Sequence, residues 1–205
     1  MEQGHIVCPN GHYTCEHCSS QAIRPIIEQV LSNSSSTDPY VLVEQIFAQA
    51  VVPMLGCAHA YIAAGALLGA INNEGTIPGG MADIREVFKR TEKQAHGGYC
   101  GLTGVCGIAP ALGAVVSLLS GARCGKDREQ HNTMEAVTLI SRAITDLTGP
   151  SCCKAYLWGS LKVMVSFVDT CLGVTLDLGD DPSCTSMALH PHGCRKEKCP
   201  YSGMK

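Results

Sequence analysis

The N-terminal segment CPNGHYTCEHC concentrates residue types that bind metal ions. Three cysteines and a histidine, Cys8, His12, Cys15 and Cys18, follow a C-x3-H-x2-C-x2-C spacing. Tetrahedral zinc takes four thiolate or imidazole ligands, and the short turn between Cys15 and Cys18 lets two thiolates reach one ion. The spacing therefore predicts a zinc site, with ordinary exposed thiols as the alternative. It resembles half of a cross-brace RING-type motif, but the paired halves of that motif are missing, so we infer no ubiquitin-ligase function.

A second group of cysteines lies near the C-terminus. Cys194 and Cys199 are spaced C-x4-C, Cys184 comes before them, and two histidines lie between Cys184 and Cys194. The segment has too few apolar residues to order itself, so a bound metal ion would supply the missing folding free energy. We expect at least two of the three cysteines to bind metal, either in a site of their own or in one shared with the N-terminal segment.

Further cysteines are predicted at the starts of apolar helices. His59 opens one helix, Cys106 a second, and the adjacent pair Cys152 and Cys153 a third. The positive end of a helix dipole lowers the pKa of a thiol and favours a thiolate nucleophile or ligand. If these starts converge, Cys106, Cys152 and Cys153 are candidate catalytic residues. Together with Cys100 and His59, they are also candidates to bind a cofactor.

A packing role is the alternative for these residues, because a buried cysteine behaves as a small hydrophobic side chain. We expect only that role for Cys57, Cys124 and Cys171. The vicinal pair follows Gly-Pro-Ser, and adjacent cysteines rarely form a mutual disulfide without strain. A ligand or persulfide role is therefore favoured for the pair, with an iron-sulfur cluster or redox metal as the internal cofactor and zinc at the termini. An open coordination position there would accept a small sulfur-containing substrate.

Composition narrows the function further. The chain has 205 residues, 13 cysteines, one Trp, three Phe and a net charge of -3, which argues against a nucleic-acid partner. The odd cysteine count and the absence of a secretory pattern in MEQGHIVCPNGHYTC favour a reducing cytoplasm. Gly97 to Gly104 is a weak anion-binding loop, because no strand precedes it and no nucleotide fingerprint is met. Neither a Ser-His-Asp arrangement nor a catalytic carboxylate pair follows from the spacing.

Apolar periodicity predicts an all-α fold, a bundle of about seven helices with short Cys/His metal-binding knuckles at both termini. Residues 1–19 are the N-terminal knuckle, 20–173 the helical domain and 174–205 a cysteine-containing tail packed on it. The uncharged stretch Gly97 to Ala122 is long enough to span a bilayer. Its seven glycines and its proline favour a central, closely packed helix instead, so we expect no membrane partner. The helices are expected at about 21–31, 39–51, 59–72, 83–94, 106–120, 132–147 and 152–171.

Five motifs occur in an order that resembles the uncharacterised domain-of-unknown-function family 5714 of archaea and bacteria. They are CPNGHYTCEHC, CAHAYIAAGALLGAINNEG, GVCGIAPALGAVVSLLSGA, GPSCCKAYLWGSLKVMVSF and the final C-x4-CPY. The likeness covers nearly the whole chain. That family occurs alone or attached to radical-SAM or methyltransferase-like proteins, which implies an anaerobic, metal-linked role and a partner of that kind. The matching positions are Cys8, His12, Cys15, Cys18, His59, Cys106, Cys152, Cys153, Cys194 and Cys199.

These observations support three hypotheses. The leading one is a cysteine-rich metalloprotein, with terminal zinc and an internal cluster or metal that handles sulfur or redox chemistry. The second is a zinc-stabilised, non-enzymatic accessory module for a partner enzyme. The third is a thiol redox sensor. The sequence leaves enzymatic activity and a homo-oligomeric state open.

Overall fold

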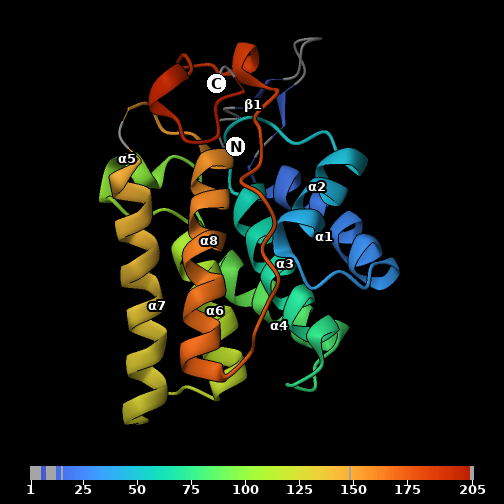
Figure 1. The fold of residues 1–205 in the computed structure, drawn as a ribbon. Helices are drawn as coiled ribbons and strands as arrows, with labels where there is room; N and C mark the ends of the chain where they lie inside the picture. The colour runs from blue at the N-terminus through green and yellow to red at the C-terminus, as the bar shows by residue number, and fades with distance from the viewer. Residues whose placement is uncertain (1–5, 8–12, 15, 148, 204–205) are drawn as a thin grey trace.

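The computed structural model describes residues 6–7, 13–14, 16–147 and 149–203, and the described chain is predominantly helical (Figure 1). A small antiparallel sheet pairs β1 (Ile6–Val7) with β2 (Tyr13–Thr14). The α-helices are α1 (Glu16–Asn33), α2 (Pro39–Gln49), α3 (Ala58–Glu74), α4 (Met81–Glu92), α5 (Tyr99–Thr103), α6 (Ile108–Ser120), α7 (Asp127–Asp146) and α8 (Cys153–Leu172). The all-α class is confirmed. The described residues form eight α-helices, one more than the seven expected, because the glycine-rich segment before α6 forms α5.

The middle of the bundle is α3, which packs against α1, α2, α4, α6 and α8. Every residue from Ala58 to Ile71 is buried. Small side chains make this possible, because a helix surrounded on all sides needs close approach of its neighbours. A Cβ atom added at Gly65 would lie 2.6 Å from Cγ2 of Ile27 on α1. The glycine therefore sets the spacing between α1 and α3.

Local sequence signals define several helix ends. Asp38 is the N-cap of α2, its Oδ1 accepts the backbone N–H of Tyr40 at 2.7 Å, and Pro39 takes the first helical position. On α4, Asp83 lies in the first turn and accepts the N–H of Gly80 at 2.9 Å, as the helix dipole favours. These contacts stabilise the starts of α2 and α4.

The uncharged stretch of residues 97–122 is divided between α5 and α6. Gly104 ends α5 with a positive φ of 79°, and α6 then spans 13 residues packed against α3, α4, α7 and α8. Within the described ranges, no helix combines the length and the apolar character needed to cross a bilayer. The prediction of a central, packed helix is therefore confirmed for α6.

After α8 the chain reverses and runs back along that helix to its N-terminal end (Figure 1). The backbone N–H of Gly179 donates to Asp38 at 2.8 Å, and Lys162 on α8 pairs with Asp181 at 2.8 Å. The tail then forms two short 3-10 helices, η1 (Met187–Leu189) and η2 (Lys196–Lys198). This return places the C-terminal cysteines beside the start of α8.

Replacement of Gly65 by Leu is expected to lower the free energy of unfolding by about 1–3 kcal/mol, because the new side chain would overpack the α1–α3 contact. Urea denaturation followed by circular dichroism measures the change. Gly101→Ala is the matched control, since a Cβ there meets nothing within 4 Å. Equal midpoints for Gly65→Leu and the wild type would contradict the close approach.

A candidate thiol site between α8 and the C-terminal tail

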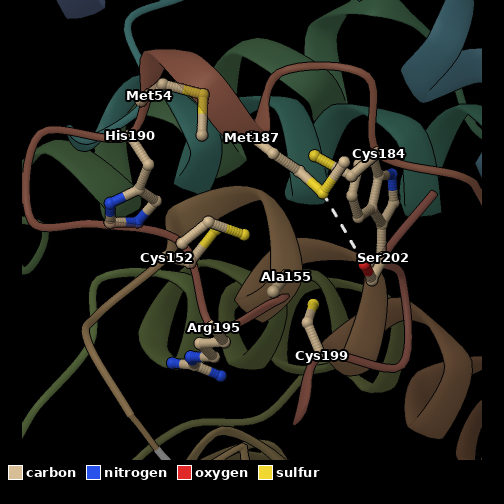
Figure 2. A pocket seen from close by; sticks show the side chains of 11 residues that line it. Met54, Cys152, Ala155, Cys184, Met187, His190, Arg195, Cys199 and Ser202 are labelled. Carbon is tan, nitrogen blue, oxygen red and sulfur yellow. Dashed lines mark hydrogen bonds between the residues drawn. The ribbon is translucent and has the colours of Figure 1, made fainter. Parts of the chain in front are cut away.

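Four cysteines line one small cavity between the start of α8 and the tail (Figure 2). They are Cys152, Cys184, Cys194 and Cys199. The cavity volume is about 20 Å³, which holds about one water-sized guest. Met54 and Met187 contribute two further sulfur atoms to its wall. The structure thus joins Cys152 to the three C-terminal cysteines, a grouping that the sequence did not predict.

Backbone hydrogen bonds fix the positions of the tail cysteines. Cys184 N–H donates to the carbonyl of Tyr201 at 2.8 Å, and Cys199 N–H donates to the carbonyl of Lys196 at 2.9 Å. The sulfur of Cys194 accepts the N–H of Lys196 at 3.3 Å. Lys196 itself has a φ of 53°, a left-handed conformation that is uncommon outside glycine. A tight turn from Cys194 to Cys199 therefore presents both cysteines to the cavity.

Cys152 is the N-cap residue of α8 and lies across the cavity from the tail. Burial raises the pKa of its thiol, and the N–H of Ala155 and the charge of Arg195 partly offset that rise. Negative charge on Cys199 or Cys184 would raise the pKa further. The thiols are thus close enough to influence one another, and a cation that displaced their protons would relieve the repulsion.

Arg195 brings a buried positive charge to the cavity wall. Its side chain is only 8% exposed, and its Nε and Nη2 both donate to the carbonyl of Pro150, at 2.9 and 2.7 Å. The guanidinium also lies 5.3 Å from the ring centre of Tyr156. Its Nη1 is buried without a hydrogen-bond partner, and in the described part of the chain no carboxylate pairs with it. A buried charge of this kind is costly unless an anion accompanies it, and ionised thiols would provide one.

His190 also lines the cavity, but both of its ring nitrogens are engaged. Nε2 donates to the carbonyl of Ser151 at 3.0 Å, and Nδ1 accepts the backbone N–H of His192 at 3.2 Å. Burial lowers the pKa of His190, which agrees with the neutral ring that these bonds require. In this arrangement His190 positions the backbone before Cys152, and the cysteines are the available ligands.

The second cysteine of the vicinal pair lies in a different environment. The sulfur of Cys153 accepts the N–H of Gly56 at 3.5 Å, just before α3. Burial raises the pKa of Cys153 to about 12 and that of Cys106 to about 11, and charge on Cys106 or Cys100 would raise the pKa of Cys153 further. The starts of α3, α6 and α8 therefore come near one another around Gly56. Cys152 is directed to the tail cavity instead. The expected lowering of the thiol pKa by the helix dipole is wrong for Cys106, Cys152 and Cys153, because burial raises all three pKa values.

His59 belongs to this internal region and is only 1% exposed. Its Nδ1 lies 3.0 Å from the carbonyl of Gly56 and must donate to it, so Nε2 carries an unprotonated lone pair. That Nε2 is buried without a hydrogen-bond partner. Burial lowers the pKa of His59 to about 4, so the ring is neutral at physiological pH.

The predicted metal knuckles are not confirmed. Cys8, His12 and Cys15 lie outside the described residues, and Cys18 is placed only as part of the α1 backbone. Among the residues that the structure describes, no three Cys, His, Asp or Glu side chains are arranged as a metal-binding group. The four cavity cysteines therefore share one space without forming a ready-made chelate, and thiol rotation would be part of any metal binding. Sequence reasoning did not place Arg195, Met54 and Met187 at the cavity wall, because no motif gives a signal for them.

Native alkylation should separate the cysteines by environment. In metal-free protein at pH 8, we expect Cys153 and Cys106 to react with iodoacetamide at least about tenfold more slowly than exposed Cys124, because a raised pKa leaves less thiolate. Peptide mass spectrometry gives the rate at each site. In urea the differences should disappear. Equal native rates for Cys153 and Cys124 would contradict the buried position of Cys153.

Comparison with known proteins places the chain in a family. The model of a family of unknown function, DUF5714, matches residues 27–202. This range contains all four cavity cysteines and omits the N-terminal CPNGHYTCEHC segment. Neither the curated proteins nor the solved structures include a match to the chain. Because the match spans well over half of the sequence, the chain belongs to the DUF5714 family.

Proposed function

We propose that this protein binds a single thiophilic metal ion in the tail cavity through Cys152, Cys184, Cys194 and Cys199. The observation that carries the proposal is the convergence of four cysteines, one from the start of α8 and three from the tail, on a cavity of about 20 Å³. Soft thiolate ligands select zinc, iron and copper(I) over the hard cations magnesium and calcium. Binding such an ion is the chemistry that this set of side chains supports best.

Simple packing accounts less well for the same cysteines. A buried cysteine is a small hydrophobic residue, and Cys199 is 8% exposed. However, the buried guanidinium of Arg195 lies in the same wall and has one unpartnered nitrogen. An apolar thiol core would leave that charge without compensation, whereas a metal with several thiolates is an anion. The Arg195 environment thus favours a metal-thiolate centre.

The size of the cavity helps to decide between a single metal ion and an iron-sulfur cluster. Room for about one atom-sized guest favours a mononuclear ion over an iron-sulfur cluster. Four thiolates fill a tetrahedral ion completely, and closed sites of this type are structural in zinc proteins. In this form the ion fastens the tail to α8, which supports the hypothesis of a metal-stabilised accessory module. Iron in the same ligands would add one-electron chemistry.

The remaining expectations are predictions without a structural test. A radical-SAM or methyltransferase partner and an anaerobic role rest on the resemblance to the family, and a small sulfur-containing substrate rests on the pattern of internal cysteines. Terminal zinc at Cys8, His12, Cys15 and Cys18 rests on the sequence alone. The same holds for an internal cluster at Cys106, Cys152 and Cys153 with Cys100 or His59. Cytoplasmic localisation likewise rests on the cysteine content of the sequence.

Loss of the cavity cysteines should remove one metal equivalent. We expect Cys152→Ser/Cys199→Ser, purified without oxygen, to contain one ion per chain fewer than the wild type, because two of four ligands are gone. Elemental analysis and the thiolate-to-metal charge-transfer bands of the cobalt(II) form measure the loss. Cys124→Ser/Cys171→Ser is the matched control, since neither residue lines the cavity. Unchanged metal content in the first variant would contradict the proposal.

Removal of the metal should loosen the tail before it affects the bundle. We expect a chelator to increase amide hydrogen exchange in residues 183–203 while α3 keeps its protection, because the ion adds to the free energy that holds the tail. Mass spectrometry of peptic peptides resolves the two regions. Equal exchange in the tail with and without chelator would show that the ion does not fasten it.

A further inference from the structure

Sulfur atoms predominate among the possible metal donors that line the tail cavity. Four thiols and the thioethers of Met54 and Met187 supply six sulfur atoms. In the described part of the chain, no Asp or Glu lines the cavity, and both nitrogens of His190 are already engaged. Thioether sulfur is a ligand that soft metal ions accept and hard ones reject. We propose that the site selects copper(I), a soft monovalent d10 ion, and that Met54 and Met187 determine this specificity.

This inference rests on the proposed metal-thiolate function and adds the class of ion. Figure 2 shows Met54, Met187 and Cys184 along one side of the cavity, with Cys152 and Cys199 along the other. Met54 lies in the segment between α2 and α3, and Met187 is the first residue of η1. Two separate segments of the chain therefore each bring a thioether to the cavity wall.

One of these thioethers is also oriented by a polar neighbour. The hydroxyl of Ser202 donates to Sδ of Met187 at 3.6 Å, the contact drawn as a dashed line in Figure 2. Met164, by comparison, is fully buried in the core and does not line the cavity. Met164 serves packing, whereas Met187 is held at a cavity that could receive an ion.

Charge balance favours a monovalent ion at this position. A divalent ion with four thiolates carries two negative charges, and Arg195 neutralises only one of them. Copper(I) bound by two of the four cysteines as thiolates, with the other two keeping their protons, carries one negative charge, which the buried guanidinium of Arg195 neutralises. Because a buried net charge is unfavourable, the neutral combination is preferred. Neutral thioethers can then complete the coordination without adding charge.

The test compares copper(I) with zinc in a variant that removes only the thioethers. Met54→Leu/Met187→Leu preserves side-chain volume, so the fold should tolerate it. Under anaerobic conditions, copper(I) affinity is measured against bicinchoninate, and zinc affinity is measured against a chromophoric zinc chelator. We expect the variant to lose about tenfold or more in copper(I) affinity and to keep its zinc affinity within about twofold. Met81→Leu/Met134→Leu is the control, and it should bind both ions as the wild type does.

A direct readout comes from methionine labelled with 13C in the methyl group. The NMR signals of Met54 and Met187, assigned from the single Leu variants, should shift when one equivalent of copper(I) is added and stay in place with zinc. The signals of Met81, Met134 and Met164 should not move with either ion. This result would not follow from a purely structural effect of the two methionines.

The outcomes separate this inference from the proposed function. Unchanged copper(I) affinity in Met54→Leu/Met187→Leu, or unmoved methyl signals, would overturn the selectivity. The proposed metal-thiolate site would still stand if Cys152→Ser/Cys199→Ser reduced zinc binding. Failure of the wild-type cavity to bind either ion would overturn both proposals.

Discussion

The return of the C-terminal tail along α8 is the constraint on which the candidate site depends. Cys152 is fixed by the helix that it caps, while Cys184, Cys194 and Cys199 reach it only because the chain reverses after α8. Contacts of Gly179 with Asp38 and of Asp181 with Lys162 hold the reversed segment in place. These polar contacts are mostly exposed, and such contacts contribute little each. A metal ion shared between α8 and the tail would supply the stronger connection.

The buried charge of Arg195 gives the cavity its electrostatic character. Because Arg195 directs two donors to Pro150 and stacks near Tyr156, it is held rigidly beside the thiols. A fixed positive charge favours thiolates and opposes an excess of cationic charge. The same residue therefore supports metal-thiolate binding and limits the charge of the ion that fits best. The position of Arg195 and its charge therefore both favour binding of a metal ion by thiolates in this cavity.

Much of the helical framework could be predicted from the sequence, because its signals are local. The Asp38-Pro39 cap, the all-round apolar pattern of α3 and the amphipathic pattern of α4 each depend on neighbouring residues. The short helix α5 was missed, since its five residues lie among glycines and bury no side chain. A local pattern of that length carries little information.

The grouping of the cysteines could be predicted only in part. The sequence indicates that Cys152 and Cys153 start a helix, but not that the extended N-cap residue, with φ -135° and ψ 106°, faces the tail while the next residue faces Gly56. Contacts between residues far apart in the sequence decide where the C-terminal tail lies. No local sequence pattern therefore indicates that Cys152 shares a cavity with Cys184 and Cys199. Arg195, Met54 and Met187 were missed for the same reason.

The most direct test of the account is X-ray absorption spectroscopy of the metal in a full-length variant without the predicted N-terminal ligands, Cys8→Ser/His12→Ala/Cys15→Ser/Cys18→Ser. The account predicts one bound ion with a sulfur-only first coordination shell and no metal-metal scattering. A shell of nitrogen or oxygen ligands, a metal-metal distance typical of a cluster, or the absence of bound metal would contradict it.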